Sequence, residues 1–544
     1  MSNKYVIIGG VAGGATAAGK IRREDEQAEI VMFERGPYVS FANCGLPYYI
    51  GGDIKNRDEL LLMTPDSFWE KYRVQVHAQH EITEISPKNK KIKVKDPDGK
   101  EFAEDYDKLI LSPGAEPIYP PLPGIASEHV FKLRTVPDMD RITDYIEQKK
   151  PQTAVVIGGG FIGLEMAEAF HQKEIQVTVV EMMPHILPPL DQDTAMLFTD
   201  MITRDGFDII AGNAVQEIKD KSVVLNDGKE VAADVVLVSA GVKPEIALAQ
   251  KAGLTIGEFG GIVVNDYMQT SDESIYAVGD AIEIKHCVSG KVCRIPLAGP
   301  ANRQGRIAAI NVCGGKVKYK GALGTSIVKV FEYAAAMTGL SERLAESLGF
   351  DVMTSMTLSD NHSSYYPGAS SIWVKLIYEA GTGKLLGAQT LGEEGTDKRL
   401  DVLATAIHAG MTVENLEDLD LSYAPPFGSA NDPVNVAGFV ATHILKGDYK
   451  DVQKPSELLE GTQLIDVRNP DEIEKDGQLE NAINIPLPIF RDNVNKIDKT
   501  KPVVLYCVRG YRSYLALRIL AGNGFKDLAM ISGGYPRAKA NGWL

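Results

Sequence analysis

Two stretches of the chain repeat the same order of features, and this repeat limits the fold more than any other feature. Each copy begins with a short apolar run, residues 5–8 and 154–157, as expected for a strand buried on both faces of a parallel sheet. A glycine-rich turn, a helix-like stretch and a second apolar strand ending in a glutamate follow. The first glycine and the glutamate lie 25 residues apart in one copy and 23 apart in the other. The repeat predicts two parallel α/β units.

Both turns have the residue types that a bound dinucleotide requires. Glycine allows a tight turn and lets the backbone approach a pyrophosphate, and the helix N-terminus offers N–H groups to the phosphates. A carboxylate at the end of the second strand, Glu34 or Glu181, can then bind the adenosine ribose hydroxyls. The second copy fits G-x-G-x-x-G, whereas Val11 takes the middle glycine position of the first. A lone glycine turn is weak evidence, but two copies in this context predict two bound dinucleotides.

The glutamate of the second copy also indicates which nicotinamide dinucleotide binds. A carboxylate at Glu181 should repel the extra phosphate of NADP, and no arginine follows in residues 182–184. We therefore expect NADH, with NADPH as the alternative.

A third signal is the short strand of residues 270–280, which ends in Gly279 and Asp280. Alone it could be a simple strand and turn. After two dinucleotide folds, it resembles the second flavin-binding motif of the pyridine-nucleotide–disulfide oxidoreductase family, and the resemblance covers most of residues 1–445. The resemblance implies FAD on the first fold, with Asp280 on its ribityl chain, NAD(P)H on the second fold, and a homodimer formed through a third domain.

The cofactor-binding residues expected from these motifs are Gly9, Gly10, Ala12, Gly13, Gly14, Glu34, Arg35, Asn43, Gly114, Gly158, Gly160, Phe161, Ile162, Gly163, Glu181, Gly241, Gly279, Asp280, Pro296, Leu297 and Ala298.

Cys44 lies in the motif of residues 40–48, directly after the first glycine-rich unit. Glutathione-reductase-like members of the family have a C-x4-C pair there, but here the next cysteine is Cys287. A lone cysteine can carry redox chemistry as a mixed disulfide with a small thiol, or through a sulfenic acid. A buried structural cysteine is the plain alternative. The motif resembles the coenzyme A disulfide reductase branch, whose cysteine holds coenzyme A.

The NADH peroxidase and oxidase branch has a similar cysteine motif. Its peroxidase members carry a histidine in the first glycine loop, whereas this chain has no histidine before His77. That disfavours peroxide chemistry, which needs a nearby proton donor. An NADH oxidase and a nonenzymatic flavin redox sensor stay open as alternatives.

The resemblance also implies a coenzyme A site and a pair of assisting tyrosines. The residues that match the branch's coenzyme A contacts are Thr16, Lys20, Arg23, Ser40, Asn43, Lys71, Asn302, Arg306 and Asn431. Lys20, Arg23 and Lys71 can pair with the phosphates of the nucleotide. The plain alternative is that Lys20 and Arg23 belong to a solvated helix end. Some branch members have basic or imidazole groups where Asn302 and Asn431 stand. A thiol that binds less tightly than coenzyme A, or exchanges, is therefore an alternative. Tyr365, preferred to Tyr366 by spacing, and Tyr423 match tyrosines of the partner subunit that can assist a leaving thiolate; alone, each would be a packing residue.

A second reactive cysteine lies near the end of the chain. Cys507 ends an apolar strand and opens a loop to Arg512, before a helix expected from Ser513. Loop N–H groups, the helix dipole and Arg509 or Arg512 favour a thiolate. C-x4-R, with Asp-x-Arg upstream at residues 466–468, resembles rhodanese, whose cysteine carries sulfur as a persulfide. We expect Cys507 and Arg512 to be catalytic; an inactive rhodanese-like binding module is the alternative.

Length and composition agree with this organisation. At 544 residues, with 44% hydrophobic and 24% charged residues, the chain is globular and too long for one core. A formal net charge of −16 argues against nonspecific binding to nucleic acid or an anionic membrane. No apolar run is long enough to span a bilayer. Five cysteines suit a reducing cytoplasm, and without paired C-x-x-C or H-E-x-x-H motifs we expect no metal site.

We therefore expect an α/β protein with two Rossmann-like domains, an α+β dimerisation domain and a rhodanese-like α/β domain. The expected ranges are 1–150 and 241–322 for the FAD-binding domain, 151–240 for the NAD(P)H-binding domain, 323–447 for dimerisation, 448–455 for a linker and 456–544 for the rhodanese domain. The expected activity is NADH-dependent reduction of coenzyme A persulfide, polysulfide or coenzyme A disulfide through Cys44, coupled to Cys507 and releasing sulfide or thiol.

Overall fold

The computed structural model describes residues 3–543, which divide into two compact units. The first unit contains the chain up to Met182 together with Ile210–Gly324, and the second contains Met183–Ile209 together with the chain from Thr325 onward. No helix within residues 3–543 has both the length and the apolar character needed to cross a membrane.

The first unit holds two α/β sheets and smaller antiparallel pieces. Its strands are β1 (Lys4–Ile8), β2 (Glu29–Glu34), β3 (Val74–Ala78), β4 (Glu81–Ser86), β5 (Lys91–Lys95), β6 (Glu101–Asp105), β7 (Lys108–Leu111), β8 (Ala115–Pro117), β9 (Val130–Phe131), β10 (Thr153–Ile157), β11 (Gln176–Glu181), β13 (Val215–Lys219), β14 (Ser222–Leu225), β15 (Glu230–Ala232), β16 (Val235–Val238), β17 (Val242–Pro244), β18 (Ile262–Val263), β19 (Ile275–Ala277), β20 (Ile282–Lys285) and β21 (Val292–Cys293); β12 (Phe207–Ala211) spans the boundary between the units. Its helices are α1 (Ala12–Glu24), α2 (Leu46–Gly51), α3 (Pro65–Tyr72), α4 (Val136–Lys149), α5 (Phe161–Gln172), α7 (Ala247–Lys251) and α8 (Ala298–Val312), with short 3-10 turns that include η1 (Asn43–Gly45) and η4 (Gly279–Ala281).

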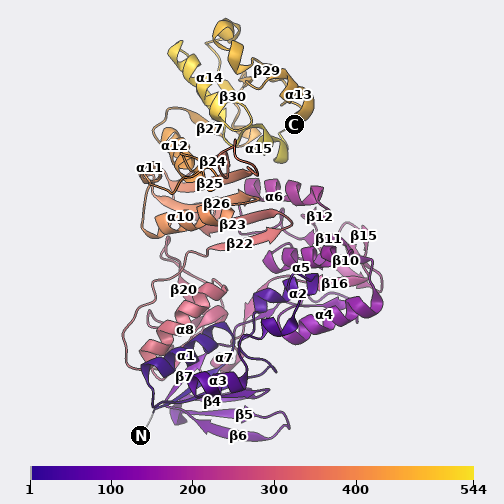
Figure 1. Cartoon of the computed structure of the whole chain (residues 1–544), viewed down its shortest axis with the longest axis vertical. Coiled ribbons are helices and arrows are strands. Elements are labelled where there is room, and N and C mark those ends of the chain that lie inside the picture. The colour runs from indigo at the N-terminus through magenta and orange to yellow at the C-terminus, as the bar shows by residue number, and fades with distance from the viewer. Residues whose placement is uncertain (1–2, 544) are drawn as a thin grey trace. The chain divides into compact units, whose positions relative to one another are not determined.

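The first sheet has the strand order β19-β7-β1-β2-β3, and its strands are all parallel. Residues 5–8 of the central strand β1 are buried, as the sequence predicts for a strand covered on both faces. Helices α1 and α8 pack together beside this sheet (Figure 1).

The second sheet has the order β12-β11-β10-β16-β9, and the two copies of the repeat thus supply the centre of each sheet. One domain boundary differs from our expectation. Strand β9 lies inside the range 1–150 but pairs with β16, with Val130 opposite Val236. Two residues are too few to show a hydrophobic pattern, so the sequence does not indicate which sheet β9 joins. Only the tertiary pairing with β16 determines it.

The second unit consists of an antiparallel sheet, a parallel sheet and their helices. Its elements are α6 (Gln192–Arg204), β22 (Ser326–Val330), β23 (Tyr333–Gly339), α9 (Glu342–Ser347), β24 (Val352–Asp360), β25 (Ser371–Glu379), β26 (Leu385–Gly392), α10 (Thr396–His408), α11 (Val413–Glu417), α12 (Pro433–Leu445), β27 (Lys450–Val452), β28 (Gln463–Asp466), α13 (Pro470–Asp476), β29 (Ile483–Asn484), η6 (Leu487–Ile489), β30 (Val503–Tyr506), α14 (Tyr511–Gly522), β31 (Leu528–Ile531) and α15 (Gly534–Ala540). The antiparallel sheet runs β22-β23-β26-β25-β24, and α10 and α12 pack on it (Figure 1).

Helix α6 groups with this second unit, although we placed it in the NAD(P)H-binding range 151–240. A buried ion-pair network explains the difference. Lys375 of β25 is only 2% exposed and donates to Asp193 of α6 at 2.9 Å. Arg537 of α15 also donates to Asp193 at 2.9 Å. A buried cation needs a paired carboxylate, and α6 provides it.

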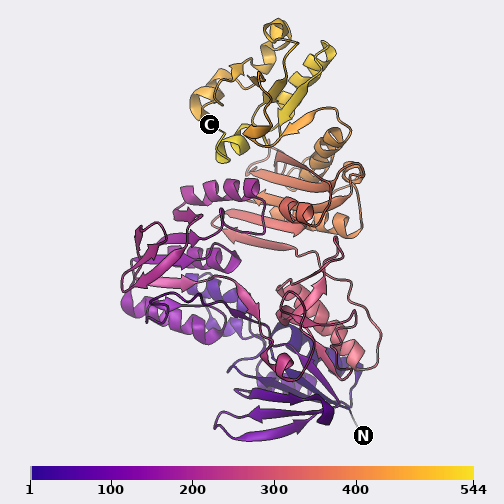
Figure 2. The same ribbon diagram turned by 180° about the vertical axis from the view of Figure 1, so that it is seen from behind.

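The parallel sheet near the end of the chain runs β27-β31-β30-β28-β29. Figure 2 shows this part of the chain from behind, in orange to yellow. Strand β27 lies inside the range 448–455 that we expected to be a linker. It pairs with β31, with Lys450 opposite Ala529 and Val452 opposite Ile531. We expected a linker because the residues of β27 are mostly polar, but an edge strand tolerates charged side chains. The expected α/β class is confirmed.

Candidate functional site

The two glycine turns have the same geometry. Gly9 has φ +94° and Gly158 has φ +111°, which are left-handed conformations that side chains disfavour. A Cβ atom at Gly9 would lie 2.1 Å from the carbonyl oxygen of Ser112, and one at Gly158 would lie 2.2 Å from that of Ser239. Glycine is therefore required where each first strand ends.

The two glutamates hold these turns in place. Glu34 accepts a hydrogen bond from the Gly10 N–H at 2.9 Å, and Glu181 accepts one from the Gly159 N–H at 2.7 Å. Neither α1 nor α5 has a side-chain cap at its N-terminus. The first-turn N–H groups of each helix can therefore serve a phosphate, as the sequence predicts for both copies.

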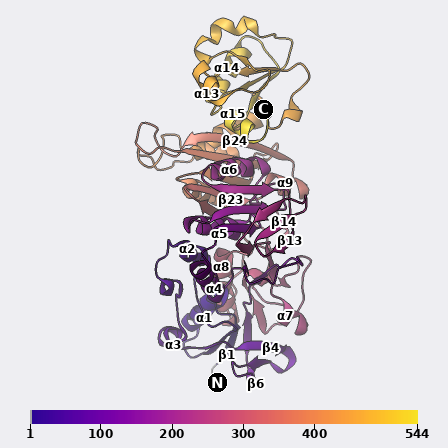
Figure 3. The ribbon, with the colours of Figure 1, turned by 90° about the vertical axis from the view of Figure 1, so that its right-hand side faces the viewer.

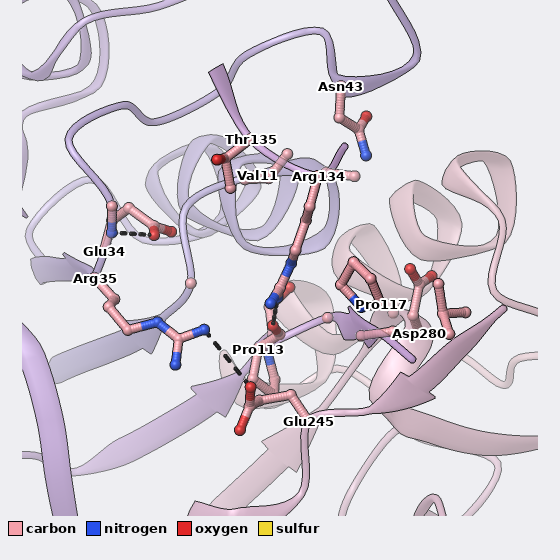
Figure 4. Close-up of a pocket in the computed structure, with 18 of the residues that line it drawn as sticks. Val11, Glu34, Arg35, Asn43, Pro113, Pro117, Arg134, Thr135, Glu245 and Asp280 are labelled. Carbon is pink, nitrogen blue, oxygen red and sulfur yellow. Dashed lines mark hydrogen bonds and ion pairs between the residues drawn. The ribbon is translucent and has the colours of Figure 1, made fainter. Parts of the chain in front are cut away.

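A pocket of about 560 Å³ opens beside the first turn, a size typical of cofactor sites. The predicted cofactor residues that line it are Gly9, Ala12, Gly13, Glu34, Arg35, Asn43, Gly114, Ile162, Gly241, Gly279 and Asp280. Those that lie outside its lining are Gly10, Gly14, Gly158, Gly160, Phe161, Gly163, Glu181, Pro296, Leu297 and Ala298. Figure 4 shows Arg35 directed at Glu245, 3.6 Å away, with Asn43 and Asp280 at other parts of the wall.

Asp280 gives the pocket a polar wall. Its turn is fixed by Gly279, whose φ is +82° and whose N–H donates to Gln304 at 2.7 Å. Burial raises the pKa of Asp280. A buried carboxylate needs hydrogen-bond donors, and a polyol chain supplies hydroxyl groups. The first glycine turn, the Asp280 wall and the pocket volume together fit FAD.

Cys44 lines the same pocket, in the short turn η1 before helix α2. Its N–H donates to the Asn43 side chain at 3.1 Å. Burial raises the pKa of the Cys44 thiol, and the carboxylates of Glu165 and Asp280 raise it further. Among the pocket-lining residues, all within the described part of the chain, Cys44 is the sole cysteine.

Glu165 is a pocket residue that our sequence reasoning missed. It lies on α5, and the Tyr48 hydroxyl donates to its carboxylate at 3.3 Å. Burial raises the pKa of Glu165 to about 7. The signal that could have found it is a single acid within the apolar run 161–167, because an acid on a buried helix face needs a reason.

We expect Glu165→Gln to stabilise the protein at pH 8 but not at pH 5. The folded pKa of Glu165 is raised, so the folded state holds a proton that the unfolded state has lost. Wild-type stability therefore falls as pH rises from about 4.5 to about 7, by about 3 kcal/mol at most. Thermal unfolding midpoints at both pH values test this, with the exposed Glu174→Gln as control. Equal shifts for the two variants would contradict it.

Some of the expected coenzyme A contacts come together at helices α1 and α8. Thr16 on α1 donates to the Asn302 side chain on α8 at 2.9 Å. Lys20, whose side chain is 17% exposed, pairs with Glu24 one helical turn away. The other expected contacts lie as follows: Arg23 on α1, Arg306 on α8, Lys71 on α3, Ser40 and Asn43 before and in η1, and Asn431 before α12 in the second unit.

The two expected tyrosines of the second unit lie side by side. The hydroxyls of Tyr365 and Tyr423 are 3.2 Å apart, and the residues are 75% and 50% exposed. The hydrogen bond from Tyr423 lowers the pKa of Tyr365. Tyr366 instead packs edge-on against His362. Figure 3 shows chain segments projecting from the sheet at the level of β24. The hydroxyl pair thus consists of Tyr365, which we preferred to Tyr366 by spacing, and Tyr423, which the resemblance implied.

The loop after β30 wraps around a buried cysteine. Cys507 is 1% exposed, and its Sγ accepts a hydrogen bond from the Gly510 N–H at 3.1 Å. Helix α14 begins at Tyr511, two residues before the expected start, so the loop is tighter than the sequence suggested. Arg512 donates to both carboxylate oxygens of Glu472 at 2.6 Å. This pairing, with a smaller contribution from Cys507, raises the pKa of Arg512.

Comparisons with known proteins agree with this geometry. Residues 3–305 match the family described as Pyridine nucleotide-disulphide oxidoreductase, residues 325–432 match its dimerisation domain, and residues 437–541 match the Rhodanese-like domain. The reduced CoADR-RHD of Bacillus anthracis is 43% identical with a TM-score of 0.96, over 99% of this chain and 98% of that one. A NAD-dependent persulfide reductase from A. fulgidus is 39% identical with a TM-score of 0.94, over 98% and 99%.

Two curated relatives each match 80% of the chain. The NADH oxidase of Methanocaldococcus jannaschii is 34% identical over 80% of this chain and 97% of its own length. The coenzyme A disulfide reductase of Staphylococcus haemolyticus is 34% identical over 80% and 99%. The chain therefore belongs to the pyridine nucleotide-disulphide oxidoreductase family, with a rhodanese-like domain after the dimerisation domain.

Proposed function

We propose that this protein is a flavin enzyme that uses NADH to reduce coenzyme A persulfide, polysulfide or coenzyme A disulfide through Cys44. One observation supports this above the others: a lone cysteine lines the same pocket as the first glycine turn and Asp280. A relative that reduces an internal disulfide would need a second cysteine beside it. We propose the expected domain ranges, with β9 in the NAD(P)H-binding domain, α6 grouped with the second unit and β27 in the rhodanese domain.

Bound FAD would take a hydride from NADH and supply two electrons to a disulfide at Cys44. With those electrons, the bond between Cys44 and its coenzyme A partner breaks, and two thiols result. Cys44 then attacks the coenzyme A sulfur of the next substrate and forms a new mixed disulfide, releasing hydrosulfide from a persulfide or a thiolate from coenzyme A disulfide. In total, NADH, one proton and a persulfide yield NAD, a thiol and hydrogen sulfide; with coenzyme A disulfide the products are two thiols.

We propose that Cys44 holds coenzyme A as a mixed disulfide between turnovers. Burial and the carboxylates of Glu165 and Asp280 raise the pKa of the free thiol, so Cys44 without a partner is mainly the neutral thiol, a poor nucleophile. Its attack on the next substrate sulfur therefore needs the thiol proton to be removed.

The tyrosine pair supports a homodimer. Tyr365 and Tyr423 are joined by their hydroxyls on an exposed surface that also presents the large apolar residue Phe427, 69% exposed. Exposed aromatic side chains are enriched at protein–protein interfaces. We propose that these hydroxyls approach Cys44 of the other subunit and donate a proton to the departing thiolate. The free thiols of all five cysteines are consistent with the cytoplasm that we propose as its location.

The rhodanese domain would exchange sulfane sulfur through Cys507, so that the two halves act in sequence. If this coupling is correct, Cys507→Ser slows sulfide release from persulfides or polysulfides. If sulfide release from every donor tested stayed unchanged, the proposed coupling would be refuted, while the proposed reductase activity would stand.

The proposed activity is tested by following NADH consumption without oxygen. We expect consumption with coenzyme A persulfide, polysulfide or coenzyme A disulfide, and little with peroxide. An NADH oxidase would instead consume oxygen at full rate with no sulfur compound, and a redox sensor would reduce its flavin without turnover. A plain coenzyme A disulfide reductase would turn over that disulfide faster than any persulfide.

A further inference from the structure

Both arginines of the rhodanese loop are already paired with carboxylates. Arg509 donates to both oxygens of Asp360 at 2.6 and 2.7 Å, and Arg512 donates to both oxygens of Glu472. Bidentate pairs of this kind have fixed geometry and are stronger than single contacts. Asp360 ends strand β24 of the dimerisation domain and lies outside the rhodanese match of residues 437–541. One of the two carboxylates thus comes from another domain.

This pairing cancels the side-chain charge around Cys507. Two guanidinium groups and two carboxylates sum to zero, and the remaining loop donors, such as the Gly510 N–H, are uncharged. An inorganic sulfur donor such as thiosulfate is a small dianion whose binding depends on nearby unpaired cations. A persulfide on an organic chain carries at most one negative charge at the reacting sulfur, and its protonated form R–S–SH carries none, so it depends less on unpaired cations than a dianion does.

We infer that Asp360 and Glu472 determine donor specificity at Cys507, making the loop select organic persulfides with an uncharged arm over anionic inorganic donors. The inference rests on the proposed sulfur-transfer role of Cys507.

The rim of the loop suits an organic donor. Tyr511, the first residue of α14, is 69% exposed, and Ile489 of η6 is 50% exposed. The turn η6 packs against α14. Large apolar side chains beside a neutral loop can contact an uncharged chain such as the pantetheine arm of coenzyme A.

The transfer step balances without an added oxidant or reductant. The Cys507 thiolate attacks the outer sulfur of the donor R–S–SH. The new bond joins Sγ to that sulfur, the S–S bond of the donor breaks, and R–S⁻ departs while the outer sulfur keeps its proton. The departing thiolate carries one charge, whereas thiosulfate would release sulfite with two.

The test compares two donors, pantetheine persulfide and thiosulfate, with cyanide as the acceptor and the full holoenzyme without NADH, so that the reductase half is silent. We expect the kcat/KM ratio of thiosulfate to pantetheine persulfide to be below about 0.01 in the wild type and to rise about tenfold in Asp360→Asn, which frees Arg509. Glu472→Gln should raise it similarly by freeing Arg512. The increase in this kcat/KM ratio should become smaller as the salt concentration rises, because exposed charges are screened. A purely structural effect of the substitution would not depend on salt in this way.

Asp527→Asn is the matched control. It breaks a pair with Lys450 at 3.2 Å on the same domain, just before the amino end of β31, whereas Cys507 follows the carboxyl end of the neighbouring parallel strand β30. The inference is overturned if the wild type uses thiosulfate as well as pantetheine persulfide, or if Asp360→Asn leaves the ratio at the control value. Cys507→Ser separates the two ideas: persisting transfer in that variant would refute the sulfur-transfer role itself, whereas its loss together with an unchanged Asp360→Asn ratio refutes only the specificity.

Discussion

Replacing Cys44 with serine should lower NADH-dependent reduction of coenzyme A disulfide and of persulfides by at least about a thousandfold. A serine hydroxyl cannot form the S–S bond through which electrons leave the pocket. Because Asp280 and the glycine turns are untouched, the flavin should still bind and should still be reduced by NADH in a single turnover. Steady-state rates and the loss of visible flavin absorbance measure the two steps separately.

Cys287→Ser serves as the control for this variant. Cys287 is a free thiol that lies outside the pocket lining, and its Sγ donates to the Lys320 carbonyl oxygen at 3.4 Å. We expect this variant to keep the wild-type rate. Turnover that survived in Cys44→Ser would show that electrons reach the substrate by another route, as in an oxidase.

Local chemistry explains why so much of the site can be predicted from the sequence. A glycine turn, the glutamate that closes it and a cysteine at a strand end are determined by neighbouring residues. The backbone at Gly9 and Gly158 allows no side chain, and Glu34 and Glu181 then accept from each turn. The pairing of Tyr365 with Tyr423 joins two loops, but each loop has its own motif.

What could not be predicted depends on contacts between distant segments. Strand β9 has two residues, and β27 carries charged residues at an exposed edge, so neither shows the alternation of a strand. Asp360 and Arg509 lie 149 residues apart, and nothing in either motif indicates their pairing. Glu165 could be suspected from its apolar neighbours, but its place beside Cys44 follows only from the packed pocket.

Asp466→Ala should destabilise the rhodanese domain by about 3–5 kcal/mol. Asp466 and Arg468 are both fully buried, and Arg468 donates to Asp466 from Nε at 3.0 Å and from Nη2 at 2.7 Å. The guanidinium also lies 3.8 Å from the centre of the Tyr535 ring. Removing the Asp466 carboxylate leaves the buried Arg468 cation without its counter-charge. The first unit has its own hydrophobic core and should stay folded. Hydrogen exchange of the amides in β28, β30 and β31 measures the local opening free energy.

Two further variants determine whether the buried charge is the cause. Asp527→Ala removes an exposed pair with Lys450 and should cost at most about 1 kcal/mol. Asp466→Leu combined with Arg468→Met removes both charges, and it should recover much of the lost stability because a buried ion pair gains little over apolar packing. A double variant no more stable than Asp466→Ala would mean that the carboxylate acts instead through its hydrogen bond from the Arg468 N–H, at 3.0 Å, which shapes the end of β28.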